Sequence, residues 1–164
     1  MYSLLYEIYR YFAVQSQSVC LKLKRIIMIH REVNLKVLVL KFGGSCLANP
    51  EKINNRAQLI KQYRDQGYAL IVVVSAMGNQ TNELVKLAYQ VSSSPHRREL
   101  DMLLTTGERI SMSLVSMVLN DLGCPAISLT GSQAGVLTEE EHNNAKIKEL
   151  KPIRVEEELQ KGKV

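Results

Sequence analysis

The sequence predicts an α/β fold with a parallel-type sheet and helices on both faces. Two short apolar runs, residues 35–40 and 69–74, are rich in β-branched side chains and have the length of buried strands. Each run leads into a loop of small residues and then into a segment with apolar residues at helical spacing. Strand, loop and helix repeated in this order predict a parallel sheet with connecting helices. The ligands of such sheets gather at the carboxyl ends of the strands.

The first run ends in the loop Gly43-Gly44-Ser45, and a helix is expected soon after it. Asn49 can cap the start of that helix, and Pro50 suits its first turn. Gly67 is expected to close the helix.

The second run ends in a loop at residues 75–78, and Thr81 is expected to cap the helix that follows. A longer helix is predicted from Arg97 to about Leu122, with its methionines in the core (Met102, Met112 and Met117). A third strand is expected at residues 126–130, followed by a flexible connection at 131–135. Another strand is expected at 147–155 and a short closing helix at 156–160.

Residues 1–33 differ from the rest of the chain. They carry five basic and two acidic side chains, whereas residues 34–164 carry sixteen and fourteen. The nearly neutral second part argues against nucleic-acid binding, and no apolar run reaches the roughly 18–20 residues of a membrane span. The first segment fits a targeting or membrane-surface segment, an amphipathic extension, or an unintended extension of the reading frame before Met28. We favour the last interpretation, because the organised pattern begins at Leu35.

Lys41 ends the first predicted strand, directly before Phe42, Gly43, Gly44 and Ser45. Adjacent glycines let backbone amides approach a phosphate, and a lysine supplies positive charge for phosphoryl oxygens. The order of glycine and lysine is the reverse of a Walker A loop. A tight turn beside an exposed lysine explains the pentapeptide equally well.

Glu108 lies on an otherwise apolar part of the long predicted helix. A carboxylate there can orient the ammonium group of a ligand. Taken alone, the residue is better explained as a surface glutamate paired with Arg109. The three histidines have no second ligand at metal-binding spacing, so no metal site is predicted.

Five stretches together resemble the aspartate kinase branch of the amino acid kinase family. They occur in the family's order between residues 35 and 164, and their SAMG, TTGERIS and TGSQAG forms are similar to the single-function enzymes. Each stretch is weak alone, but five in register are highly specific (Lys41–Cys46, Val72–Leu84, Arg98–Ser111, Ser128–Thr138 and His142–Val164).

The resemblance implies the amino acid kinase (carbamate kinase-like) fold, with residues 34–164 forming an amino-terminal lobe that stops before the ATP lobe. It implies a cytoplasmic enzyme that uses ATP and Mg²⁺ to phosphorylate the side-chain carboxylate of L-aspartate, the first step toward lysine, threonine and methionine. Lys41 would stabilise the transferred phosphoryl group, and residues 42–45 would bind phosphate (Phe42, Gly43, Gly44 and Ser45). Ser75, Thr81 and Glu108 would hold aspartate, with Glu108 facing its ammonium group.

Two departures from the family limit this expectation. Cys46 stands where the family usually has a small hydroxyl residue, and the nucleotide lobe with its metal-site aspartate is absent from the sequence. We therefore expect these 164 residues alone to be inactive. Two alternatives stay open: a non-catalytic fragment that binds aspartate or pairs with a complementary carboxyl-terminal half or a second copy, and a kinase for another amino acid.

Overall fold

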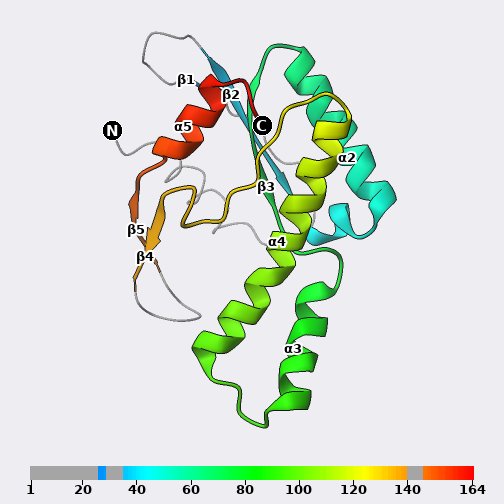
Figure 1. The fold of residues 1–164 in the computed structure, drawn as a ribbon, viewed down its shortest axis with the longest axis vertical. Coiled ribbons are helices and arrows are strands. Elements are labelled where there is room, and N and C mark those ends of the chain that lie inside the picture. Colours follow the sequence, from blue (N-terminus) through cyan, green and yellow to red (C-terminus); the bar gives the residue numbers. More distant parts are fainter. Residues whose placement is uncertain (1–25, 29–34, 140–145) are drawn as a thin grey trace.

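The structure is a computed structural model that describes residues 26–28, 35–139 and 146–164. Strands and helices alternate in the first half of this part and confirm the predicted α/β class (Figure 1). The elements, in chain order, are β1 (Ile26–Met28), β2 (Lys36–Phe42), the 3-10 helix η1 (Gly44–Leu47), α2 (Pro50–Asp65), β3 (Ala69–Val74), α3 (Gln80–Val91), α4 (Arg97–Asp121), β4 (Val136–Thr138), β5 (Ile147–Leu150) and α5 (Ile153–Gln160).

The main sheet contains the parallel pair of strands that the sequence predicts. β2 and β3 run side by side, with Val37 opposite Ala69 and Phe42 opposite Val74. The carboxyl ends of both strands therefore lie at the same edge of the sheet. On its other side β2 pairs with β1 in the antiparallel direction, so the described three-stranded sheet is mixed.

Helix α2 begins where its capping residues predict. The Asn49 side chain accepts a hydrogen bond of 2.9 Å from the backbone N–H of Lys52, and Pro50 is the first helical residue. This bond satisfies one of the N–H groups that a helix start leaves without a partner. The helix ends at Asp65, and Gly67 follows it with a φ of 87°, as expected for a glycine that closes a helix.

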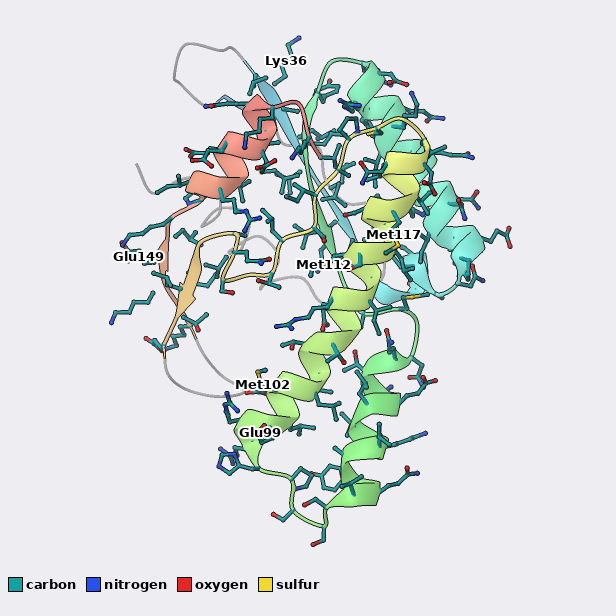
Figure 2. All side chains as sticks on the ribbon, viewed as in Figure 1. Lys36, Glu99, Met102, Met112, Met117 and Glu149 are labelled. Atoms are coloured by element: carbon teal, nitrogen blue, oxygen red, sulfur yellow. The ribbon has the colours of Figure 1, made fainter. Side chains whose placement is uncertain are left out.

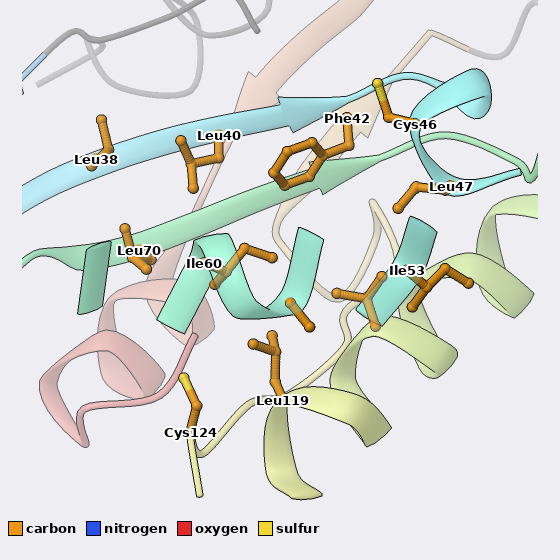
Figure 3. Packing of buried hydrophobic residues seen from close by; sticks show 12 residues of the cluster. Leu38, Leu40, Phe42, Cys46, Leu47, Ile53, Ile60, Leu70, Leu119 and Cys124 are labelled. Carbon is orange, nitrogen blue, oxygen red and sulfur yellow. The ribbon is translucent and has the colours of Figure 1, made fainter. Parts of the chain in front are cut away.

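The hydrophobic core lies between the parallel strands and helices α2 and α4 (Figure 3). Phe42, at the end of β2, is 2% exposed and is among the largest buried side chains. Burial of a side chain of this size contributes about 1.5–3 kcal/mol. The other core members come from both strands, both helices and the turns beside them (Leu38, Leu40, Cys46, Leu47, Ile53, Ala57, Ile60, Leu70, Val115, Leu119 and Cys124).

Helix α4 buries one narrow stripe and exposes much of its remaining surface. The stripe repeats every four residues and consists of Gly107, Ser111, Val115 and Leu119. Among the described residues, α4 is the one helix that is long enough and apolar enough to cross a membrane. Core helices can share this length and composition.

The expectation that all three methionines of α4 pack in the core is wrong for two of them. Met102 is 46% exposed and Met117 is 59% exposed. At 100° per residue, both lie on the side of α4 turned away from its buried stripe. Figure 2 shows the labelled methionines spread along the helix, and Figure 1 shows α3 and the first half of α4 extending beyond the sheet.

The third predicted strand, residues 126–130, is not a strand of either described sheet. The backbone at the start of this segment nevertheless forms hydrogen bonds in the pattern of a parallel strand pair. The N–H of Val164 donates to the carbonyl of Pro125, and the N–H of Ile127 donates to the carbonyl of Val164, both at 2.9 Å. Among the residues that the structure describes, Val164 alone pairs with the segment at this point, and a sheet needs a longer run of pairs.

The opposite edge of the same segment is bonded by a side chain. The Asn120 carboxamide accepts from the N–H of Ala126 at 3.1 Å and donates to the carbonyl of Ala126 at 3.2 Å. Farther along, the N–H of Thr130 donates to the side-chain oxygen of Gln133 at 3.0 Å. Alternate residues of an extended chain direct their backbone groups to opposite edges, so Asn120 takes the place of a neighbouring strand.

The last part of the chain forms a small hairpin and a short helix. β4, which the sequence did not reveal, pairs with β5 in the antiparallel direction. The strand expected at 147–155 is shorter than predicted, because Pro152 precedes α5 and the helix begins at Ile153.

The turn after α5 is held by ionic and polar contacts. Glu158 forms ion pairs with Lys163 and Lys161, with N–O distances of 2.6 and 2.9 Å, and these contacts lower the pKa of the Glu158 carboxyl to about 2. The guanidinium group of Arg64 donates to the carbonyl of Gly162 at 2.8 Å. Together these contacts fix the turn that leads to Val164.

Candidate active site

The loops after β2 and β3 are joined at the edge of the sheet. The N–H of Gly78 donates to the carbonyl of Gly44 at 2.9 Å. Residues 41–45 and 75–78 therefore form one surface at the carboxyl ends of two parallel strands. Ligands of α/β sheets bind at such an edge.

The two glycines of the first loop have different surroundings. A Cβ atom on Gly44 would lie 2.6 Å from the carbonyl oxygen of Ala76 and 3.2 Å from that of Gly78. A Cβ atom on Gly43 would meet nothing within 4 Å. Gly44 is therefore required for the contact between the loops, whereas Gly43 borders open space.

Helix α4 packs closely against the second loop. A Cβ atom on Gly107 would lie 2.9 Å from the Cβ atom of Ala76, which is 3% exposed. One turn later, the fully buried hydroxyl of Ser111 donates to the carbonyl of Ser75 at 2.7 Å. The Ser75–Gly78 loop is thus held between the loop after β2 and the middle of α4.

The predicted phosphate-binding residues all lie at the end of β2 or just after it. Lys41 is exposed and lies opposite Val73 in the sheet, and Ser45 is exposed in η1. Phe42 has its side chain in the core, which leaves only its backbone for contact with a ligand. The Nζ atom of Lys52 in α2 donates to the carbonyl of Ser45 at 3.0 Å and adds a second ammonium group beside this loop.

The predicted aspartate-binding residues belong to three elements that meet around Ala76. Ser75 is half-buried directly after β3, and Glu108 is exposed on α4 directly after Gly107. Thr81 is exposed, but it does not cap α3 as expected, since the helix begins at Gln80 and Asn79 precedes it. The fold brings the backbones of these three residues into one region of the molecule.

The third loop, residues 130–135, is closed by its own contacts. The hydroxyl of Thr130 accepts from the N–H of Gln133 at 3.3 Å, in addition to the bond between the Thr130 N–H and the Gln133 side chain. Gly135 has a φ of 80°, and its carbonyl accepts from the N–H of Lys151 at 2.8 Å. The loop is therefore attached to the end of β5.

The donors around the first two loops suit an anion better than a divalent cation. They are ammonium groups, hydroxyls and backbone groups, which bind phosphate oxygens. Within residues 35–139 and 146–164, no three histidine, cysteine, aspartate or glutamate side chains lie close enough together to hold a metal ion.

Sequence reasoning missed three residues of this region. Ser111 is the one buried polar residue among those described, and its position four residues after Gly107 on an apolar helix was an available signal. Lys52 gave no signal, because its contact depends on the turn of η1. Gln80 was also missed: its buried side-chain oxygen has no hydrogen-bond partner in the described part of the chain and lies 3.6 Å from the Cβ position of Gly107.

Comparisons with known proteins agree on one family. Residues 36–164 match the model of the amino acid kinase family. The chain is 50% identical over 130 residues to an aspartokinase of Corynebacterium glutamicum. The aligned region covers 79% of this chain and 31% of that relative.

Solved structures give the same result. A crystal structure of aspartate kinase from Synechocystis superposes with a TM-score of 0.65 at 47% identity, over 78% of this chain and 20% of that one. E. coli aspartokinase III in complex with aspartate and ADP also superposes with a TM-score of 0.65. Its 20% identity, over 78% of this chain and 39% of that one, supports a likeness of fold alone.

Proposed function

We propose, from the premise that this chain belongs to the amino acid kinase family, that it forms the aspartate-binding half of an aspartokinase. The observation that carries the proposal is the joining of the Lys41–Ser45 and Ser75–Gly78 loops through the bond between Gly78 and Gly44. Identities of 47–50% to aspartokinases support the choice of substrate. The finer fold assignment, an amino acid kinase lobe with helices on both faces, is part of the same proposal.

The reaction is the transfer of the γ-phosphoryl group of ATP to the side-chain carboxylate of L-aspartate. A carboxylate oxygen forms the new bond to phosphorus, the bond from phosphorus to the oxygen of the β-phosphate breaks, and ADP leaves. The carboxylate is already ionised at neutral pH, so no general base is required. Positioning of the two reactants and stabilisation of charge on the phosphoryl oxygens are sufficient.

The loop after β2 would bind the phosphate groups. The exposed ammonium group of Lys41 would stabilise the charge on the transferred phosphoryl group. The open space at Gly43 lets a phosphate approach the backbone amides without meeting a side chain. ATP is used with Mg²⁺ in such reactions, but the donors of this region do not fit the cation, and we assign it no ligand here.

The loop after β3 and the neighbouring helices would bind aspartate. The exposed carboxylate of Glu108 would pair with the substrate ammonium group. Hydroxyl groups of Ser75 and Thr81 would donate to the substrate carboxylates. The contact of Gly107 with Ala76 supports this assignment, because it brings these elements to one place.

Calorimetric titration of the chain with L-aspartate tests the proposal. We expect binding that Glu108→Ala weakens about tenfold to hundredfold, the range for loss of a charged hydrogen bond. Glu83→Ala is a matched control, since Glu83 is an exposed glutamate in the first turn of α3. Succinate lacks the ammonium group, so its weaker binding should be insensitive to Glu108→Ala. Aspartate binding that survives Glu108→Ala unchanged would contradict the role of Glu108.

A second candidate function is association with a complementary polypeptide. The bonds of Val164 with Pro125 and Ile127 support it, because they show that this edge of the segment can pair with main chain in the parallel direction. We expect no formation of aspartyl phosphate by the 164 residues alone, and activity after addition of the carboxyl-terminal part of an aspartokinase. Turnover without that addition would refute the expectation of an inactive chain.

Three parts of the proposal go beyond this region. A kinase of amino acid biosynthesis is expected in the cytoplasm, and localisation of a tagged chain tests this. Homo-oligomer formation is tested by sedimentation. A substrate panel that includes glutamate and acetylglutamate decides between aspartate and another amino acid.

A further inference from the structure

We infer that Ser111 is a positioning residue, which holds the Ser75–Gly78 loop at the distance from α4 that ligand binding requires. The inference rests on the proposed function for the identity of the ligand. Its structural basis is the hydrogen bond from the Ser111 hydroxyl to the Ser75 carbonyl, which joins residues 36 positions apart.

The hydroxyl of Ser111 makes two contacts of different origin. It lies 2.9 Å from the carbonyl of Gly107, four residues earlier, and 2.7 Å from the carbonyl of Ser75. A serine within a helix commonly bonds to the carbonyl four residues before it. The contact with Ser75 is not explained by helix geometry, because Ser75 lies outside the helix. The single hydroxyl proton is shared between the carbonyl oxygens of Gly107 and Ser75.

Because the Ser111 hydroxyl is buried, its bond to the Ser75 carbonyl favours one position of the Ser75–Gly78 loop. Ser111 is 0% exposed, so no water competes for its hydroxyl while the loop is in place. If the loop moved away, the hydroxyl would keep only the bond to Gly107 in its own helix, and the Ser75 carbonyl would lose its partner. The loop is therefore favoured in the one position that keeps the bond.

Ser111 acts on both proposed ligand-binding loops. The peptide that it holds precedes Ala76, and Ala76 lies against Gly44 on one side and Gly107 on the other. Two residues later, Gly78 is bonded to Gly44 in the Lys41–Ser45 loop. Movement of the Ser75 carbonyl would thus change the contact between the loops.

The experiment compares Ser111→Ala with Ser113→Ala in the 164-residue chain. Ser113 lies on the same helix and is half-buried, so both variants gain the same helix propensity. Ser111→Cys is included because a thiol is slightly larger than the hydroxyl and leaves no cavity, but it is a weak donor; this variant therefore tests the loss of the hydrogen bond without loss of packing. Two quantities are measured below the unfolding temperature: the hydrogen-exchange rate of the Gly78 amide and the dissociation constant for L-aspartate.

We expect Ser111→Ala and Ser111→Cys to accelerate exchange at Gly78 about tenfold and to weaken aspartate binding about tenfold, the effect of one lost hydrogen bond. Exchange at Leu40 in the core reports global stability and should change less than exchange at Gly78. Ser113→Ala should leave both quantities at their wild-type values.

The outcomes separate this inference from the proposed function. If only the unfolding temperature falls, Ser111 is merely structural and the inference is overturned. Weaker binding without faster exchange at Gly78, or faster exchange without weaker binding, overturns it as well. If the wild-type chain does not bind aspartate, the proposed function fails, and the exchange rate at Gly78 alone then decides whether Ser111 positions the loop.

Discussion

Substitution of the two neighbouring glycines in the loop after β2 should have opposite effects on stability. Neither Gly43 nor Gly44 is among the described glycines with positive φ, so alanine fits the backbone at both positions. A Cβ atom on Gly44 would lie 2.6 Å from the carbonyl oxygen of Ala76, whereas one on Gly43 meets nothing within 4 Å. The pair therefore separates steric contact from backbone entropy.

The magnitude follows from two opposing effects. Introduction of an atom into packed structure costs about 1–3 kcal/mol, and replacement of glycine by alanine on a compatible backbone stabilises by about 0.4–1 kcal/mol. We expect Gly44→Ala to lower the free energy of unfolding by about 1–2 kcal/mol, because the obstacle is backbone rather than a flexible side chain. Gly43→Ala experiences only the stabilising effect.

Thermal and urea unfolding, followed by circular dichroism, measure the difference. For a chain of this size, 1 kcal/mol shifts the Tm by about 2–4 °C. The Tm of Gly44→Ala should therefore fall by about 2–8 °C, and that of Gly43→Ala should stay equal or rise by up to about 4 °C. Equal Tm values for the two variants would refute the argument that Gly44 is required by the contact between the loops.

Three further outcomes are expected. The lowered pKa of Glu158, about 2 against a usual 4.5, means that its two ion pairs stabilise the fold above pH 4.5 and that this contribution is lost as the pH falls toward 2. Urea unfolding from pH 6 to pH 2.5 should therefore show a smaller pH dependence for Glu158→Gln than for the wild-type chain. Asn120→Ala should destabilise by about 0.5–1.5 kcal/mol in urea unfolding, because it removes the side chain that bonds both backbone groups of Ala126 at an exposed position; unchanged stability would contradict the description of that edge. Gln80→Met should keep or raise the Tm, since it removes a buried acceptor that has no partner among the described residues, and a clear fall would show that this oxygen has a partner.

Local patterns were sufficient to predict the elements that position the candidate site. Residues 36–42 and 69–74 are strands because short β-branched runs suit a buried parallel pair. Asn49 and Pro50 start α2 because both act within a single turn. The strand pattern and the helix-start pattern together predict that Lys41 and Gly43–Gly44 lie at the carboxyl edge of the sheet.

Expectations failed where the outcome depended on distant partners. Residues 126–130 have the composition of a strand, but a strand needs a neighbour, and among the described residues the start of this segment is paired only by the Asn120 side chain and Val164. Thr81 has the chemistry of a cap, yet α3 begins one residue before it. The spacing of Ser111 from Gly107 indicates a buried hydroxyl, but its partner Ser75 could not be identified, because it lies 36 residues away.

The two edges of the segment after α4 have a consequence for self-assembly. A strand that can pair on both sides transmits addition from one copy to the next, and open-ended growth follows. Here the Asn120 carboxamide closes the edge at Ala126, while the edge at Pro125 and Ile127 pairs with main chain. A strand that adds at Ala126 must displace the Asn120 carboxamide, so this one side chain makes the segment less open to pairing on that edge.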